Sequence, residues 1–231
     1  MRKILALIIL ICISTSQTFA NEESGVVYWN TDAGKVLRAR ISAKADYWQL
    51  SPTFAVQSTQ TYCSVASAIT VLNAMPIQKP VDPAYAPYPY FTQSNFFTPE
   101  VTKLISPQTV LAIGMTRDQM AEILTRHGVK TKSIGGDTLT DEGLRTLLQK
   151  VLGDDGQFVL VNYFRATLGQ VGGGHWSVLA AFDAESDKVL ILDVAKYKYT
   201  PVWVSISMLR QSIATIDATS NKARGLVIVS E

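Results

Sequence analysis

One cysteine without a partner stands in the stretch VQSTQTYCSVASAIT, Val56 to Thr70. The sequence has two cysteines, Cys63 and Cys12, and Cys12 lies in an N-terminal apolar run that we expect to be removed. A free thiol in an exported protein is open to oxidation and mispairing, because disulfides form in such compartments. Cys63 is therefore either buried and inert, used between chains, or used in chemistry.

Two histidines can be considered as partners of this thiol. His127 lies at the end of an expected helix before Gly128, where interaction with the terminal carbonyls is its expected role. His175 follows the glycines at 172–174 and opens the run HWSVLAAF. Glycines there allow unusual dihedral angles and a close approach of the backbone to a ligand. His175 is therefore the candidate base.

An acidic partner for His175 follows from a predicted hairpin. The strand KVLILDV returns after a turn, and a hairpin centred near residue 184 makes His175 and Asp193 cross-strand neighbours. Such neighbours have Cβ atoms about 5 Å apart, within reach of a carboxylate–imidazole hydrogen bond. A one-residue bulge would change this register. Taken singly, a histidine at a strand end and an aspartate after a strand are more often structural.

The combination of cysteine, histidine and aspartate predicts nucleophilic catalysis. A carboxylate fixes the histidine tautomer, the imidazolium stabilises a thiolate, and a helix N-terminus adds positive potential. Acyl transfer also needs a donor for the developing oxyanion. Gln57 stands six residues before Cys63, which is the spacing between the oxyanion glutamine and the nucleophile in papain-like enzymes. Gln60 is closer to Cys63 but has no such precedent.

The elements that must position these side chains begin with a helix. Cys63 to Met75 has one apolar side and is followed by Pro76, which predicts a helix with Cys63 in its first turn. The stretch Pro76 to Thr92 holds five of the nine prolines and three tyrosines, which predicts an extended loop. This loop could belong to a binding cleft or be a surface loop anchored by its tyrosines.

The rest of the chain predicts helices first and strands later. Thr116 and Gln119 fit a capping box for a helix that runs to about Arg126, and Thr140 fits the cap of another helix that ends before Gly153. A short helical stretch is expected at about 207–213. The expected strands are Val26–Trp29, Phe158–Tyr163, Trp176–Phe182, Val189–Val194, Val202–Ile206 and Leu226–Val229. This order predicts an α+β domain with a mainly antiparallel sheet.

The N-terminal residues predict export. A basic start and an apolar run from Ile4 to Ile13 precede a small-x-small cleavage signal that ends at Ala20. The run is too short for a stable membrane span, although an uncleaved anchor is the alternative. We expect residues 1–20 to be a signal peptide and residues 21–231 to be one catalytic domain, periplasmic and free of the membrane after cleavage.

Composition argues against a nucleic-acid partner. Loss of Arg2 and Lys3 leaves as many basic as acidic residues, 19 of each, and no run rich in lysine or arginine stands out. Such a chain has no electrostatic attraction for nucleic acid or an anionic membrane. The G-x-S-x-G, P-loop, H-E-x-x-H and paired-cysteine zinc patterns are missing. A single cysteine also disfavours a tight soft-metal site, so we predict no metal site.

Several blocks make the sequence similar to the phytochelatin synthases, especially their short bacterial members. They are KADYWQLS (Lys44–Ser51), QTYCSVASAITVLNAM (Gln60–Met75), FTQSNFFT (Phe91–Thr98), NYFRATLGQVGGGHWS (Asn162–Ser177), LILDVAKYKYTPVW (Leu190–Trp203) and RGLVIVS (Arg224–Ser230). The resemblance implies a papain-like fold with a helical part and a sheet part. It makes Cys63 the nucleophile, His175 the base and acid, and Asp193 the orienting carboxylate. It places Gln57 at the oxyanion position.

The resemblance also implies glutathione as the substrate. In the family, the thiolate attacks the Cys–Gly amide, glycine leaves, and a γ-glutamylcysteinyl thioester remains on the enzyme. Plant members pass this group to a second glutathione, often as a thiolate of Cd²⁺ or another soft metal, whereas short bacterial members chiefly use water. Acylation needs no cofactor, and the resemblance is compatible with a homodimer.

Three further residues are assigned through the resemblance. Arg165 and Arg224 match family positions that hold the γ-glutamyl head of the substrate. Arginine suits a carboxylate there, because its planar fork binds both oxygens. Asn162 is expected to line the same pocket.

Some features depart from the family pattern. Ser64 stands where glycine usually follows the cysteine, and Trp176 and Val178 replace the aromatic residue and the proline of an H-F-S-P motif. The chain ends at Glu231 without the cysteine-rich C-terminal region of plant members, which favours hydrolysis or weak transfer over metal-activated synthesis. Two alternatives stay open. One is a papain-like peptidase similar to bacteriocin-leader peptidases, and the other is a non-enzymatic periplasmic thiol- or metal-binding module.

Overall fold

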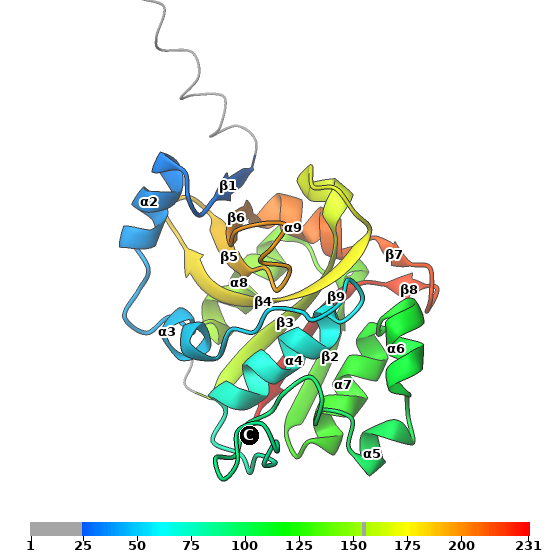
Figure 1. The fold of residues 1–231 in the computed structure, drawn as a ribbon. Coiled ribbons are helices and arrows are strands. Elements are labelled where there is room, and N and C mark those ends of the chain that lie inside the picture. Colours follow the sequence, from blue (N-terminus) through cyan, green and yellow to red (C-terminus); the bar gives the residue numbers. More distant parts are fainter. Residues whose placement is uncertain (1–24, 154–155) are drawn as a thin grey trace, which may run out of the picture.

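The computed structural model describes residues 25–153 and 156–231, so the predicted signal peptide lies outside the described residues (Figure 1). Within this part, seven strands form one antiparallel sheet. They are β1 (Val26–Tyr28), β2 (Lys130–Gly135), β3 (Gln157–Phe164), β4 (Gly174–Asp183), β5 (Lys188–Leu192), β6 (Val202–Ser205) and β9 (Gly225–Ser230). Their order in the sheet is β1-β6-β5-β4-β3-β9-β2, and β7 (Ile216–Asp217) pairs with β8 (Lys222–Ala223) in a separate hairpin.

Helices cover both faces of this sheet, which confirms the α+β class. The α-helices are α2 (Asp32–Ala39), α3 (Tyr47–Leu50), α4 (Cys63–Ala74), α5 (Pro99–Thr102), α6 (Pro107–Ile113), α7 (Arg117–Arg126), α8 (Asp141–Val151) and α9 (Ile206–Ile213). Short 3-10 turns are η1 (Ser51–Thr53), η2 (Gly136–Thr138) and η3 (Arg165–Leu168). None of the described helices is both long and apolar enough to cross a membrane.

Alternation along β3 builds two hydrophobic clusters. Phe158 and Leu160 pack with α4 and α7, whereas Val159 and Val161 pack with α8 and α9. Successive side chains of a strand point to opposite faces, so one strand serves both clusters. The apolar residues of β3 therefore belong to both clusters, and β4, the middle strand of the sheet, lies beside β3.

Helix α4 lies deep in the first cluster. All of its residues except Ala74 are buried, so it is apolar or small around its whole circumference rather than on one side only. The helix ends at Ala74 because Met75 takes an extended conformation before Pro76, as residues before proline usually do. The predicted helix is confirmed to within one residue.

The predicted strands are confirmed to within two residues at each end. The capping box of α7 forms between Thr116 and Gln119, and the Thr140 side chain caps α8. Helix α2 and strand β2 were not expected. Strand β2 is an edge strand with largely exposed side chains, so its sequence KTKSIG lacks the apolar alternation of a half-buried strand.

The predicted register between β4 and β5 is wrong. Val178 pairs with Leu192, so continuing the ladder would bring Ser177, not His175, opposite Asp193. Next to the turn Asp183 pairs with Lys188, so the hairpin is centred between 185 and 186 rather than near 184, and a bulge between Leu179 and Ala181 then shifts the pairing by one residue. His175 and Asp193 are instead diagonal neighbours on one face, a spacing that long side chains still bridge.

The proline-rich segment from 76 to 92 is confirmed as a loop with one isolated bridge. Asn73 of α4 holds its end: Asn73 Nδ2 donates to Phe91 O at 2.8 Å, and Phe91 N donates to Asn73 Oδ1 at 2.9 Å. The Asp82 carboxylate accepts hydrogen bonds from Thr92 and Ser94. The loop is thus tied to the helix that carries Cys63.

Candidate active site

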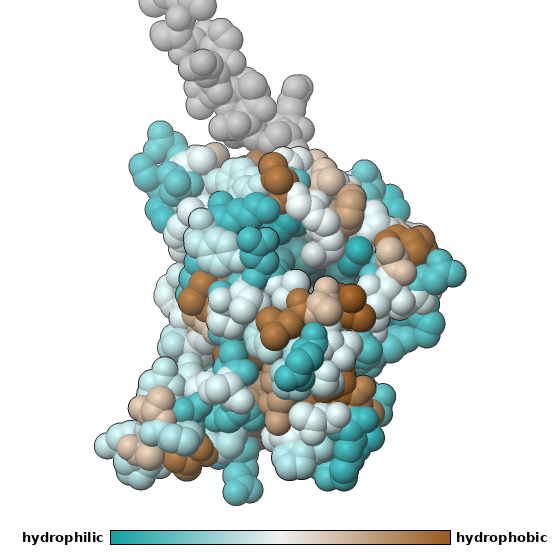
Figure 2. All heavy atoms as spheres, turned by 45° about the vertical axis from the view of Figure 1, so that its right-hand side comes forward, coloured by the Kyte–Doolittle hydropathy of each residue, from teal (hydrophilic) through white to brown (hydrophobic). Residues whose placement is uncertain are grey.

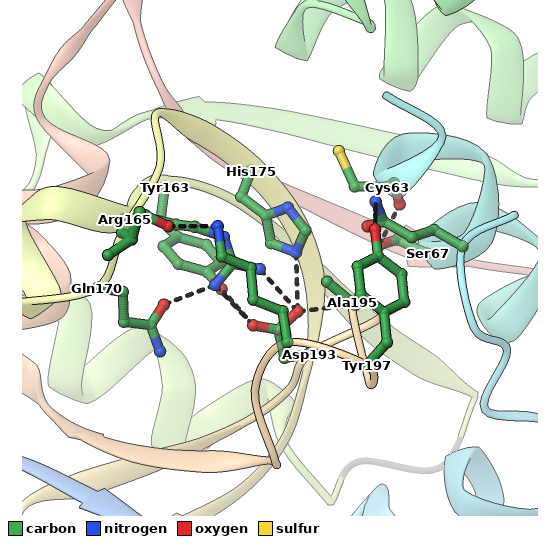
Figure 3. A network of polar contacts seen from close by, with 12 residues as sticks. Cys63, Ser67, Tyr163, Arg165, Gln170, His175, Asp193, Ala195 and Tyr197 are labelled. Atoms are coloured by element: carbon green, nitrogen blue, oxygen red, sulfur yellow. Dashed lines mark hydrogen bonds and ion pairs between the residues drawn. The ribbon is translucent and has the colours of Figure 1, made fainter. Parts of the chain in front are cut away.

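Cys63, His175 and Asp193 come together at the junction of α4 and the sheet (Figure 3). Cys63 is the first residue of α4, and its thiol is near enough to His175 for the charge of one group to affect the other. On the other side of the ring, His175 Nε2 lies 2.9 Å from Asp193 Oδ1. All three side chains are buried. The structure therefore brings the three predicted residues together in the order thiol, imidazole and carboxylate.

The charge states of Cys63 and His175 are coupled. Burial raises the pKa of the Cys63 thiol, but the charge and hydrogen bond of His175, with the amide N–H groups of Trp176 and Ser64, lower it further than burial raises it. Burial lowers the pKa of His175, but Cys63 and Asp193 together raise it by more, so the pKa lies above its ordinary value. Both shifts favour a thiolate–imidazolium pair.

Asp193 lies at the centre of the polar network. Its Oδ1 accepts hydrogen bonds from His175 Nε2, from Ala195 N at 2.9 Å and from Arg165 Nη2 at 2.9 Å. Burial alone would raise the pKa of Asp193, but the bonds and charges of His175 and Arg165 hold it well below its usual value. The carboxylate stays ionised and fixes which ring nitrogen faces Cys63.

The position of Arg165 corrects a sequence-based expectation. Its Nη1 lies 2.8 Å from Asp193 Oδ2 and donates to Gln170 Oε1 at 2.6 Å. With Nη2 also on Asp193, the guanidinium is committed to the network (Figure 3). Arg165 therefore does not present its fork to the γ-glutamyl head of a substrate.

Arg224 lies in a pocket of about 240 Å³ that Cys63 also lines. The pocket is lined by Cys63, Ile113, Gly114, Met115, Asn162, Gly174, His175, Trp176, Asp217, Ala218, Thr219 and Arg224. Arg224 Nη1 donates to Asn162 Oδ1 at 2.9 Å, and its Nη2 lies 3.9 Å from Asp217 Oδ1. The predicted residues Arg224 and Asn162 thus share one pocket, and Asn162 orients the arginine.

Asp217 was not found by sequence reasoning. It stands on β7, where it pairs with Lys222 of β8, and this hairpin brings it to the pocket. Its signal was the turn-rich run TIDATSNK between two apolar stretches, which is typical of a hairpin. Nothing in the run itself indicates that its aspartate faces Arg224.

A second pocket of about 290 Å³ shares Gly174 and His175 with the first. Its lining is Gln57, Gln60, Arg165, Gly172, Gly173, Gly174, His175, Ala195, Tyr197 and Lys198. Gln57 Nε2 donates to Thr59 O at 2.8 Å and to Tyr197 Oη at 2.9 Å. Both amide hydrogens are in use, so Gln57 lies near the site without offering a free donor in this arrangement.

Gly174 has a steric reason to be glycine. A Cβ there would lie 2.2 Å from Arg224 Nη1. Gly172 has a φ of +126°, which side chains rarely adopt, and its added Cβ would lie 3.1 Å from Arg165 Cδ. The glycine run therefore gives room to two arginine side chains.

The surface around β7, β8 and α6 mixes residue types. Figure 2 turns this side forward and shows small apolar patches separated by polar residues. Trp176, behind this surface, donates from Nε1 to Met115 O at 2.9 Å. That bond ties the start of β4 to the segment between α6 and α7, which walls the pocket of Arg224.

Comparison with known proteins identifies the family. The family model for phytochelatin synthase matches residues 21–226. The chain belongs to the phytochelatin synthase family. The glutathione γ-glutamylcysteinyltransferase 3 of Lotus japonicus is 30% identical over 80% of this chain and 37% of its own length. The corresponding transferase 1 of Arabidopsis thaliana is 28% identical over 80% of this chain and 37% of its own.

A transferase of Schizosaccharomyces pombe is 23% identical over 80% of this chain and 43% of its own length. The chain thus spans roughly two fifths of the curated phytochelatin synthase relatives that it matches.

The three residues that depart from the phytochelatin synthase pattern, Ser64, Trp176 and Val178, differ in whether they line a pocket. Ser64 is fully buried, its hydroxyl has no hydrogen-bond partner within the described part of the chain, and it lines neither pocket. Val178 is a core residue. Trp176 does line the pocket of Arg224, so it is the departure that touches the site. Among residues 25–153 and 156–231, no group of three or more His, Cys, Asp or Glu residues is placed to hold a metal ion.

Proposed function

We propose that this protein is a papain-like thiol acyltransferase or hydrolase that cleaves the Cys–Gly bond of glutathione. The observation that carries the proposal is the buried Cys63–His175–Asp193 set beside a pocket that holds Arg224 and Asp217. The α+β architecture, with the nucleophile at a helix N-terminus and the base on a sheet strand, supports the papain-like assignment. The products would be glycine and γ-glutamylcysteine.

The first chemical step follows from the geometry. The Cys63 thiolate attacks the carbonyl carbon of the Cys–Gly amide, and the oxygen becomes an oxyanion. The first amides of α4 have no intrahelical acceptor, so they can donate to that oxygen. Because Asp193 holds His175 Nε2, the other ring nitrogen gives its proton to the leaving glycine amine. A thioester on Cys63 remains.

The pocket beside Cys63 suits the γ-glutamyl head. That head carries an α-carboxylate and an α-ammonium group on one carbon. Arg224 can bind the carboxylate and Asp217 the ammonium, because the two side chains face each other at 3.9 Å. Asn162 keeps the arginine fork in place.

The second pocket suits the leaving group and then the acceptor. It shares His175 and Gly174 with the first pocket, so a group bound there is next to the same imidazole. After glycine leaves, His175 takes a proton from water or from the α-amino group of a second glutathione as that oxygen or nitrogen attacks the thioester carbonyl, and Cys63 leaves as the thiolate. Gln57 serves as a further oxyanion donor only if its amide turns from Tyr197, and it stays a prediction.

Several properties remain part of this proposal. Export of the protein would limit its substrate to glutathione outside the cytoplasm. Water is the main acceptor that we propose, with short phytochelatins as minor products. Cd²⁺ would enter as a glutathione thiolate, as substrate and not as a resident ion. A homodimer is proposed only from the family resemblance.

The experiment that tests the proposal is a product analysis. The protein is incubated with glutathione, with and without Cd²⁺, and glycine, γ-glutamylcysteine and longer peptides are quantified by mass spectrometry. We expect glycine release by the wild type and none by Cys63→Ser. Absence of glycine release, or equal release by the variant, would sink the proposal.

A peptidase of broader specificity is separated by a second substrate. The tripeptide with an α-linked glutamate has the same composition as glutathione but places its carboxylate elsewhere. We expect a strong preference for the γ-linked form, and loss of most of that preference in Arg224→Lys, which keeps the charge but not the fork. Equal rates for the two tripeptides would favour the peptidase.

A further inference from the structure

A buried ion pair lies behind the proposed catalytic set. We propose that Arg165 is a positioning residue. It pairs with the Asp193 carboxylate and offsets its negative charge, while the carboxylate holds the ring of His175 in place. The arginine would thereby set the pH range in which the pair of Cys63 and His175 forms. The inference rests on the proposed function only in taking Cys63 as the nucleophile.

The contacts of Asp193 leave little freedom. The carboxylate is fully buried. One oxygen receives His175, the Ala195 amide and Arg165 Nη2, each at 2.9 Å. The other oxygen receives Arg165 Nη1 at 2.8 Å, and Tyr163 Oη lies 3.4 Å away. Arg165 is therefore the one group on this carboxylate, within the described residues, that contacts both oxygens.

Arg165 is itself held in place. Gln170 Oε1 accepts from Nη1 at 2.6 Å, and the guanidinium lies 5.0 Å from the centre of the Tyr199 ring. The residue starts η3 directly after β3, and its backbone N–H donates to Gly173 O at 3.0 Å. A bidentate fork fixed at this many points holds the carboxylate in one orientation.

The physical need for the pair comes from burial. A carboxylate without a cation in such a place would be protonated or would bind the nearest imidazolium very tightly. With Arg165 present, the guanidinium offsets part of the carboxylate charge, so His175 meets a weaker anion than an unpaired Asp193 would be. The imidazolium is then stabilised enough to form but can still release its proton.

The charged and titratable groups around the reacting pair come from several elements. They are Cys63 on α4, Tyr163 on β3, Arg165 on η3, Asp193 after β5, Asp217 on β7 and Arg224 before β9. Removal of Arg165 takes away one positive charge and leaves Asp193 uncompensated. The thiol then loses positive surroundings and the imidazolium gains a stronger anion. Both pKa values should rise.

The test uses alkylation of Cys63 by iodoacetamide, which carries no γ-glutamyl head. The rate is measured against pH by intact mass for the wild type and Arg165→Met. We expect both inflections of the profile to move to higher pH by about one unit. Arg165→Lys restores the charge and should bring both inflections back near the wild type. Arg145→Met is the matched control, because it breaks a bidentate pair with Asp187 at the far end of β4.

Two results would overturn the inference. An unmoved profile with a raised KM for glutathione would make Arg165 a substrate-binding residue. An unmoved profile with only a lower melting temperature would make it structural. If Arg165→Met does not fold, Gln170→Leu can be used instead, because it removes the hydrogen bond that Arg165 Nη1 donates to Gln170. It should move both inflections of the pH profile to higher pH by a smaller amount.

A charge-balanced double variant gives an independent check. Asp193→Asn alone leaves a buried, unpaired Arg165, whereas Asp193→Asn with Arg165→Met leaves a neutral acceptor for His175. The single variants should move the inflections in opposite directions, and we expect those of the double variant to lie between them, near the wild type, because its net charge is restored. Inflections of the double variant outside the range of the two singles would contradict the inference. Alkylation needs no glutathione, so these outcomes are separate from a failure of the proposed activity.

Discussion

The thiol of Cys63 and the ring of His175 depend on each other for their charges. Burial disfavours each charged form taken alone, yet both shifts run the other way because the two groups face each other and His175 also binds Asp193. Such coupled groups titrate as a pair. The reactivity of the cysteine is thus a property of the neighbouring strand as much as of α4.

We predict that His175→Ala raises the pKa of the Cys63 thiol above its ordinary value. Burial would persist in the variant while the imidazolium and its hydrogen bond are lost. The pKa is read from the thiolate absorbance near 240 nm as the pH is raised. His127→Gln is the control and should leave the thiol unchanged. An unaltered titration in His175→Ala would exclude His175 as the base.

We predict that Asn162→Ala weakens binding of glutathione without stopping the chemistry. Arg224 would lose the acceptor that fixes its fork, at a cost of about 1 to 2 kcal/mol, so KM should rise by roughly tenfold. The acylation step needs none of these atoms, and kcat should stay within a factor of about two. Steady-state kinetics measures both. A fall in kcat at constant KM would contradict the pocket assignment.

At the scale of elements, α4 links the nucleophile to the proline-rich loop. Asn73 makes two buried hydrogen bonds to the backbone of Phe91, and the loop closes over the end of the helix. Asn95 makes two similar backbone bonds, to Tyr90 and Thr92, at a more exposed position. Asn73 and Asn95 thus make the same number of backbone hydrogen bonds but differ in burial, so comparing them shows how burial affects the contribution of such bonds to stability.

We predict that Asn73→Ala lowers the free energy of unfolding by about 1 to 3 kcal/mol, because it leaves a buried carbonyl and a buried amide unpaired. Asn95→Ala should cost less, since water can replace its bonds. Urea unfolding followed by tryptophan fluorescence compares the two variants. Equal losses would show that burial of the Asn73 bonds has no special weight.

At the scale of the whole molecule, His127 makes stability depend on pH. Its ring lies 5.2 Å from that of Phe91 and 4.8 Å from that of Phe96. Burial lowers the pKa of His127 to about 4. The unfolded chain, with a histidine pKa near 6.5, binds a proton at a higher pH than the folded protein does. The stability that neutral His127 contributes is therefore fully present above about pH 6.5, and it is lost as the pH falls through that of the folded pKa, about 4.

We predict that His127→Gln flattens the loss of stability between about pH 6.5 and 4. The shift of His127 sets an upper limit of about 3 kcal/mol on the difference between wild type and variant. Unfolding in urea at several pH values measures it, and the variant's remaining slope reports the other titrating groups. Parallel curves for the two proteins would show that His127 is not the group responsible.

Removal of the predicted signal peptide would change the whole chain. We predict that the protein recovered from a periplasmic fraction begins at Asn21, as the cleavage signal ending at Ala20 indicates. Intact mass measurement decides this. A mass that retains the first twenty residues would favour the alternative of an uncleaved anchor.

The sequence by itself indicated many of the elements and limited the candidates for the reacting residues. Apolar period, capping residues and turn residues are local signals, so α4, α7, α8, β3, β4, β5, β6 and β9 could be placed from them. The candidates for thiol chemistry, Cys63 with His175 and Asp193, could likewise be chosen because the sequence has only two cysteines and two histidines. These conclusions needed no knowledge of distant contacts.

Only the tertiary structure decided how these residues share their charges. The turn between β4 and β5 lies further along the chain than predicted, and the bulge in β4 shifts the register by one residue, which brings His175 and Asp193 onto one face as a diagonal pair. The role of Arg165 could not be derived from its spacing, since a buried carboxylate takes whichever cation the fold brings nearest. Asp217 reached Arg224 through a hairpin for the same reason. Charge pairing depends on distance in space, and a sequence motif does not fix that distance.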